Sequence, residues 1–227
     1  MSRVFWRTLF VNLISAVSLG APLYHSAALT IDYFQDDGMV SSSASAGSSR
    51  SVHIASSAAL GGGRSLTATK GGVGSGVSRL EIVDATLGYT QGAHSGLGVV
   101  TWDGDSDPST LSAAGLGGVD LTQDEGSAFE VGLQFFDYPF NSPIQLALRV
   151  YDASAAGGTK YSEVTVVIDQ YFDGPGTFMM TLPFSIFAVA GSGTIQAPGG
   201  AFFATSTLLG AGGGADMRNV GAITLTF

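Results

Sequence analysis

Apolar and polar residues alternate in many short stretches of this chain, which is the pattern of β-strands that bury one face. In "IQLALRVY" and "EVTVVID", for example, large aliphatic residues recur at every second position. The clearest alternation predicts strands at 129–136, 144–151, 163–169, 177–182 and 222–227. Weaker alternation predicts strands at 30–34, 49–55, 64–69, 79–83, 86–90 and 95–102. After residue 28, no segment carries a convincing helical stripe.

These strands predict an all-β fold. About ten short strands separated by Gly, Pro, Asp and Ser are typical of a two-sheet antiparallel β-sandwich with a jelly-roll-like architecture. The length of 227 residues fits one such domain, which we expect to cover residues 29–227. The Ser/Ala/Gly-rich segment 38–63 has the composition of a flexible loop, although small residues also suit flat strands at a sheet edge.

The first 28 residues have the pattern of an export signal. Arg3 and Arg7 supply the positive region, and the apolar run "LFVNLISAVSLGA" follows them. Ser26 and Ala28 stand at the −3 and −1 positions of a cleavage site. The alternative is an N-terminal anchor helix that stays attached. We expect cleavage after Ala28, a secreted or cell-surface location in a bacterium, and no membrane span afterwards.

Composition and charge exclude several classes of partner. Hydrophobic residues make up 45% of the chain and charged residues only 12%, which argues against intrinsic disorder. The net charge of −9 repels nucleic acid and anionic membrane surfaces. The chain has no cysteine, so disulfides, thiolate metal sites and cysteine nucleophiles are excluded. Cations or neutral ligands such as sugars remain, with extracellular polysaccharide or other matrix proteins as the expected partners.

The sequence offers little for catalysis. Only His53 and His94 remain after removal of the signal, and no serine stands in the G-x-S-x-G order of a nucleophile elbow. A glycosidase needs two carboxylates on either side of the scissile bond. The glutamates on predicted strands lie opposite the apolar faces and are expected to point to solvent: Glu81, Glu130 and Glu163. We therefore expect a protein that is not an enzyme, with a glycoside-active enzyme as an open alternative.

Three aspartates in "TWDGDSDPST" are candidates for a calcium site. Asp103, Asp105 and Asp107 stand at every second position after a predicted strand. An EF-hand loop starting at Asp103 needs Gly at its sixth position and Glu at its twelfth, where this chain has Pro108 and Ala114. An EF-hand is therefore excluded. An Asp-rich turn and a looser Ca²⁺ site built from several loops both remain, and Ca²⁺ is the one cofactor that the sequence suggests.

Two loops combine acids with aromatic residues, "DYPFNSP" (137–143) and "DQYFDGPG" (169–176). If the four strands around them form consecutive hairpins, both loops leave the same end of one sheet. Rings that stack on sugars, beside polar groups that take the hydroxyls, would make a carbohydrate-binding cleft; the alternative is that the rings plug the ends of the core. The candidate ligand-binding residues are Tyr138, Phe140, Asn141, Tyr171 and Phe172. The candidate metal ligands are Asp103, Asp105, Asp107, Asp137, Asp169 and Asp173.

Several phrases in the last three fifths of the chain occur together in one order: "TWDGDSD", "GLGGVDLT", "LRVYD", "TLPFSIF" and "ADMRNVGAITLTF". This order resembles a large group of uncharacterised exported bacterial β-sandwich proteins of the PEP-CTERM-associated type. The closing "NVGAITLTF" is also similar to the last strand of galactose-binding-like jelly-roll modules. The resemblance implies an exported surface or matrix protein with Ca²⁺ or glycan binding. Many members carry a C-terminal sorting tail; this sequence has no Pro-Glu-Pro motif, apolar anchor or basic end, so sorting by that route is not expected.

Three functions follow as expectations. The first is a non-enzymatic secreted or cell-surface protein with a structural, matrix or adhesion role. The second is a carbohydrate-binding module stabilised by Ca²⁺, which uses the aromatic loops. The third is the glycoside-active enzyme.

Overall fold

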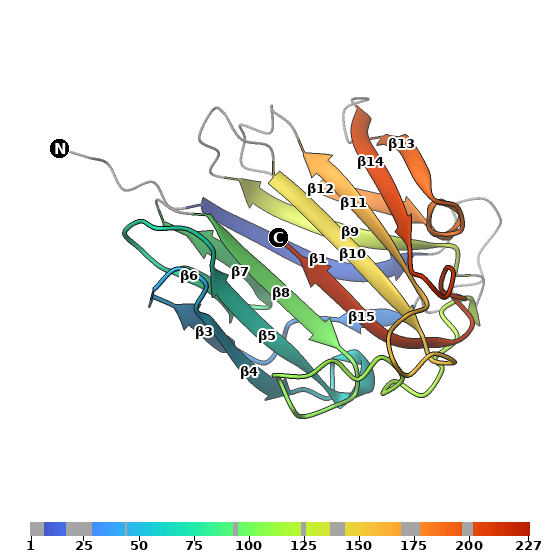
Figure 1. Ribbon diagram of the computed structural model, residues 1–227, viewed down its shortest axis with the longest axis horizontal. Helices are drawn as coiled ribbons and strands as arrows, with labels where there is room; N and C mark the ends of the chain where they lie inside the picture. The colour runs from blue at the N-terminus through green and yellow to red at the C-terminus, as the bar shows by residue number, and fades with distance from the viewer. Residues whose placement is uncertain are drawn as a thin grey trace.

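The computed structural model describes residues 7–16, 29–43, 45–92, 95–123, 126–136, 144–168, 178–196 and 202–227. These residues form two stacked antiparallel sheets (Figure 1) and no α-helix. The expected all-β, two-sheet antiparallel sandwich is confirmed. Helical turns in the described ranges are short 3₁₀ segments, η1 (Leu60–Gly62) and η3 (Phe184–Phe187). No helix in the same ranges is long and apolar enough to cross a membrane.

One sheet has seven strands in the order β12-β9-β1-β7-β6-β3, with β2 paired to β1. We call it the seven-stranded sheet. Its strands are β1 (Arg7–Ala16), β2 (Thr30–Asp32), β3 (Gly38–Ser42), β6 (Ser78–Val83), β7 (Thr86–Gln91), β9 (Ala128–Phe136) and β12 (Phe178–Pro183).

The other, eight-stranded sheet has the order β13-β14-β11-β10-β15-β8-β5-β4. Its strands are β4 (Ser49–Ala55), β5 (Gly63–Lys70), β8 (Gly96–Trp102), β10 (Ile144–Asp152), β11 (Tyr161–Ile168), β13 (Gly191–Gln196), β14 (Phe202–Leu209) and β15 (Val220–Thr226).

The core forms where the alternating apolar residues of the two sheets meet. Leu146, Leu148 and Val150 of β10 are all fully buried, as the alternation predicts, and lie in one cluster with residues of the facing sheet such as Leu80 and Val131. Removing aliphatic side chains of this size from water stabilises a fold by about 1.5–3 kcal/mol each. Burial of the alternating apolar side chains therefore makes a large contribution to the stability of the fold.

All of the strands predicted from alternation are present, within a few residues at their ends. The sequence pattern missed β1, β3, β13 and β14. In β13 ("GSGTIQ") and β14 ("FFATSTLL"), small and hydroxyl residues blur the contrast between faces, although Ile195 and Phe203 are buried. A strand near the rim of a sandwich buries fewer large residues, so alternation detects it less well.

The Ser/Ala/Gly-rich segment 38–63 is not a loop throughout, which corrects the compositional expectation. It contains β3 and β4, and each of these is the last strand of its sheet. The alternative, flat edge strands made of small residues, is the one that holds. The physical reason is that an edge strand has one neighbour and little core to fill, so short side chains suffice.

The described part of the apolar run of the expected export signal, residues 9–16, lies in β1, in the middle of the seven-stranded sheet. Residues 7–11 pair with β7, and most of β1 pairs with β9 on its other side. Figure 1 shows this blue strand crossing between the two neighbours. Cleavage after Ala28 stays a prediction, but it has a structural consequence because it would remove a central strand.

The hairpin β6–β7 shows how local sequence sets the register. Val83 pairs with Thr86, so Asp84 and Ala85 form a two-residue turn, and both have positive φ angles (51° and 57°). Two central residues with positive φ define the type I′ turn, whose twist matches that of paired strands. Asp tolerates this conformation, whereas alanine adopts it at a cost.

Candidate functional site

A buried polar cluster surrounds Asp32, and we call it the Asp32 cluster. It consists of Asp32 at the end of β2, Phe34 and Asp36 just after it, Arg64 near the start of β5, and Trp102 at the end of β8. Three strands from both sheets therefore meet at one carboxylate.

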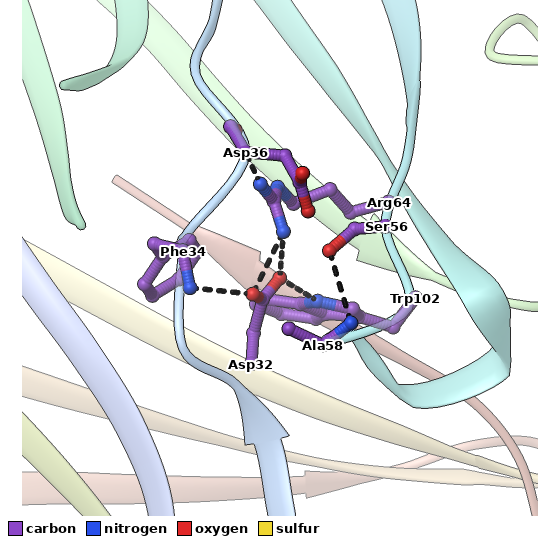
Figure 2. Close-up of polar contacts among 7 residues, drawn as sticks. All are labelled: Asp32, Phe34, Asp36, Ser56, Ala58, Arg64 and Trp102. Carbon is purple, nitrogen blue, oxygen red and sulfur yellow. Dashed lines mark hydrogen bonds and ion pairs between the residues drawn. The ribbon is translucent and has the colours of Figure 1, made fainter. Parts of the chain in front are cut away.

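The Asp32 carboxylate accepts hydrogen bonds from three directions (Figure 2). Arg64 Nη1 lies 2.7 Å from Oδ1 and 2.8 Å from Oδ2 of Asp32. Trp102 Nε1 donates to Oδ2 at 2.8 Å, and the backbone N–H of Phe34 donates to Oδ1 at 2.7 Å. The second guanidinium nitrogen, Nη2, donates to the carbonyl of Asp36 at 2.6 Å. Bonds to an ionised acceptor are the stronger kind.

Phe34 holds a strained backbone inside this cluster. Its φ is +52°, a region that a bulky residue rarely adopts. The side chain is fully buried, with its ring 6.2 Å from the Trp102 ring and 5.5 Å from the guanidinium carbon of Arg64. Strain of this kind persists only where the surroundings over-determine it. The ion pair and the two rings supply that constraint.

The Asp32 cluster has a structural role, because it is buried and connects strands of the two sheets. The side chains of Asp32 and Arg64 are both 0% exposed, so neither reaches a substrate from solvent. Breaking such a pair leaves an uncompensated charge in the core, which typically costs about 3–5 kcal/mol. The cluster therefore fixes the segment that follows residue 28 against the eight-stranded sheet.

A second buried carboxylate, Asp152 at the end of β10, joins the loops at one end of the sandwich. It accepts hydrogen bonds from Ser154 (N, 2.9 Å; Oγ, 2.5 Å), from the N–H of Asp216 (3.0 Å) and from Asn219 Nδ2 (3.0 Å), and pairs with Lys160 Nζ at 2.7 Å. Burial raises the pKa of Asp152, but the bonds from Lys160, Ser154 and Asp216 outweigh burial and hold that pKa well below its ordinary value. This carboxylate also serves structure, because its donors are the turns themselves.

The aspartates 103, 105 and 107 form a turn. Asp103 Oδ1 accepts from the N–H of Asp105 at 3.2 Å, Asp105 Oδ1 from the N–H of Asp107 at 3.1 Å, and Asp107 Oδ1 from the N–H of Ser109 at 2.9 Å. Each carboxylate thus caps the backbone two residues ahead, which is the ordinary role of Asp in turns. Asp103 is buried and also accepts from the N–H of Ser112 at 2.8 Å. Hydrogen bonds from Ser109 lower the pKa of Asp107.

The described residues contain no group of three or more His, Cys, Asp or Glu side chains arranged to hold a metal ion. Asp137, Asp169 and Asp173 lie outside those residues. Asp103 follows Trp102. Trp102 pairs with Ile223 of β15, and Ile223 pairs with Val150 of β10, so these three residues lie at the same level across the sheet. Asp169 follows Ile168, which pairs with the first residue of β10. Six residues of strand, about 20 Å, separate these two levels, and the predicted metal set stays a prediction.

The assumption of consecutive hairpins is wrong for two of the three connections. Of the four strands β9 to β12, β10 and β11 form a hairpin, whereas β9 and β12 lie in the other sheet and pair with each other. Alternation shows which residues of a strand are buried but not which sheet the strand joins. The strand ends nevertheless stay close, because Ile144 pairs with Ile168 and Leu133 with Phe178. The predicted ligand-binding residues of the two loops lie outside the described part of the chain: Tyr138, Phe140, Asn141, Tyr171 and Phe172.

The histidines and strand glutamates considered for catalysis do not converge in the described structure. His53 lies on β4 with Nδ1 3.4 Å from Ser65 Oγ, and His94 falls outside the described ranges. Glu163 belongs to the eight-stranded sheet and pairs with Arg149, whereas Glu81 and Glu130 belong to the other sheet.

Glu81 and Glu130 stand three strands apart in the sheet order, or about 14 Å, which exceeds the separation that glycosidases use. Burial raises the pKa of Glu130. A raised pKa at Glu130 does not by itself make a glycosidase site, which also needs a second carboxylate nearby.

Comparison with protein-family models, with curated proteins and with solved structures finds no match to the chain. What the structure establishes is therefore the fold, an all-β arrangement of two sheets. Sequence reasoning also missed the residues that organise this fold, Asp32, Arg64 and Asp152. Their distant partners, Arg64 and Trp102 for Asp32 and Asp216 for Asp152, lie 32, 70 and 64 residues away, and no local pattern links them.

Proposed function

We propose that the protein is a non-enzymatic, exported β-sandwich with a structural, matrix or adhesion role. The observation that carries this proposal is the outer face of the eight-stranded sheet. One residue from each strand lies in a single line across this face, which we call the cross-strand row. In spatial order its members are Ser51, Thr67, Val99, Thr226, Ala147, Thr165, Ser206 and Ser192.

The cross-strand row is uncharged and made of short side chains, all of them exposed or half-buried. Ser51 Oγ and Thr67 Oγ1 lie 2.8 Å apart, so neighbouring hydroxyls already satisfy each other. Neutral hydroxyls are far less costly to remove from water than charges. A long row of this chemistry suits contact with a polysaccharide or another protein better than it suits the binding of a small substrate.

The described acids support the same proposal. Asp32 and Asp152 are buried and occupied by structural donors, and Glu163 pairs with Arg149 at 2.6 Å. The resemblance to exported bacterial β-sandwich proteins and the signal-like N-terminus add the exported location. An acidic net charge of −9 is compatible with partners that are neutral or cationic.

A pair of matched double variants tests the role of the outer face. Thr67→Lys with Thr165→Lys places two charges in the cross-strand row, and Ser41→Lys with Thr181→Lys places two on exposed positions of the other sheet. We expect the first variant to lose retention in the extracellular matrix fraction of an exporting culture, and the second to keep it. Equal retention of both variants and the wild type would remove the support from this face.

The second candidate is a carbohydrate-binding module. It is favoured by the adjacency of Ile144 and Ile168, because the segments 137–143 and 169–176 are attached at neighbouring points. A glycan array with and without EDTA tests it, with Tyr138→Ala and Tyr171→Ala as the variants expected to lose binding. Absence of glycan binding in both conditions would exclude the carbohydrate-binding module. Turnover of chromogenic glycosides would instead support the third expectation, a glycoside-active enzyme.

A further inference from the structure

The N-terminal segment that carries the predicted export signal also supplies an internal strand, β1. The residues Arg7–Ala16 hold an internal place in the seven-stranded sheet, and the same residues carry the apolar run of the predicted export signal. We propose that the slot between β7 and β9 is a strand-acceptor site in the processed protein. Its partner is an extended, proline-free segment of another polypeptide, with apolar residues at alternate positions. This inference rests on the proposed export and on cleavage after Ala28.

The slot offers hydrogen-bonding edges on both sides. β1 runs antiparallel to both neighbours, with Val11 opposite Leu87 of β7 and opposite Leu133 of β9. Its pairing with β9 extends to Ala16 opposite Ala128. When β1 leaves, two rows of backbone N–H and C=O groups inside the sheet lose their partners. Such open edges are templates for another strand.

The slot is too wide to close by itself. Neighbouring strands lie about 4.8 Å apart, so β7 and β9 are separated by about 9.6 Å when β1 is between them. Direct pairing of β7 with β9 would require one half of the sheet to move by about one strand spacing.

Each half of the seven-stranded sheet is anchored separately, which resists that movement. On the β7 side, the Tyr89 ring stacks on Phe227 with centroids 5.9 Å apart and an interplanar angle of 14°. On the β9 side, the Phe129 ring packs edge-on against Phe184 and Phe187, at 5.1 and 5.4 Å. Closing the slot would break one of these sets of contacts.

The chemistry of the flanking strands defines the incoming segment. Leu87, Phe129 and Val131 are fully buried beside the slot, and Tyr89 is nearly so. A strand with apolar residues on its inner face would keep these four side chains buried, whereas an empty slot would expose them to water. β1 itself, with the sequence RTLFVNLISA, is rich in apolar residues and contains no proline.

The processed chain would keep the rim of the slot in place. β2 pairs with β1, but Asp32 is also held by Arg64 and Trp102, which do not depend on β1. The Asp32 cluster therefore fixes the new N-terminal residues after cleavage.

A nicked full-length chain tests the acceptor site. A protease recognition sequence placed between residues 17 and 28 allows the folded protein to be cut and the N-terminal fragment to be competed off. A fluorescent peptide of residues 7–16 then serves as the probe. We expect saturable exchange of this peptide, and binding weaker by about tenfold or more for the control peptide with Val11→Pro and Leu13→Pro, because proline has no N–H to donate to a neighbouring strand.

The outcomes separate the two proposals. Loss of the fragment with no binding of the probe, and with an unchanged melting temperature, would show that β7 and β9 close on each other and would overturn the acceptor site alone. The intact mass of the exported protein tests the processing step independently. Retention of residues 1–28 would overturn the processing on which both the export proposal and this inference depend.

Discussion

The buried ion pair between Asp32 and Arg64 allows a sharp test of what holds the two sheets together. The perturbation is Asp32→Asn, which keeps the shape and one oxygen acceptor but removes the negative charge. Arg64 would then retain the Asp36 carbonyl at 2.6 Å, while its Nε already has no partner among the described residues. The guanidinium would be a buried charge without a counter-ion.

The magnitude follows from burial. Both side chains are 0% exposed, so water does not screen the lost attraction, and removal of one partner costs about 3–5 kcal/mol. In a chain of 227 residues this corresponds to a fall in melting temperature of about 6–20 °C, at about 2–4 °C per kcal/mol. Arg64→Met in the Asp32→Asn background removes the orphaned charge and should recover part of the loss.

A surface pair on the same fold is the control. Arg149 and Glu163 connect neighbouring strands of one sheet, and their side chains are 31% and 20% exposed. Glu163→Gln should therefore cost about 1 kcal/mol or less. The assay is urea unfolding monitored by tryptophan fluorescence, since Trp102 lies in the Asp32 cluster. Equal losses for Asp32→Asn and Glu163→Gln, or no recovery in the double variant, would refute the reasoning.

Three further variants probe other contacts. Ala85→Gly should stabilise the protein by about 1 kcal/mol, because alanine at a φ of +57° carries a left-handed penalty that glycine avoids; a lower denaturation midpoint would contradict this. Asp152, whose pKa is lowered in the fold, should contribute stability above about pH 4 that is lost as the pH falls below that value, so Asp152→Asn should flatten the decline of unfolding free energy between neutral and acidic pH. Gly221→Ala should destabilise strongly, since its Cβ would lie 2.1 Å from the Ala113 carbonyl oxygen, whereas Gly157→Ala, with open space around it, should be nearly neutral in a thermal melt.

Local sequence was sufficient for part of this fold and insufficient for the rest, for physical reasons. Alternation identifies β10 and β11 and their buried residues, because burial of one face is decided by neighbours within the strand. It does not show that β9 and β12 pair with each other in the opposite sheet, since the connections cross between sheets. That pairing depends on contacts far apart in the sequence.

The site predictions also depend on whether the contacts are local or far apart in the sequence. The turn at Asp103 was predictable, because each carboxylate bonds to a backbone group two residues ahead. The Asp32 cluster was not, because Arg64 carries no local sign that it will be buried and its partners lie 32 and 28 residues away. A lone arginine in a strand is usually a solvated residue.

The composition of the two edge strands β3 and β4 bears on how the protein behaves at high concentration. Both end their sheets, and both are short and serine-rich, with Arg50 exposed on β4. Short, polar or charged edges discourage the lateral strand pairing that produces fibrils. A concentrated solution of such molecules would resist uncontrolled aggregation along these two edges, and ordered assembly would have to use other surfaces.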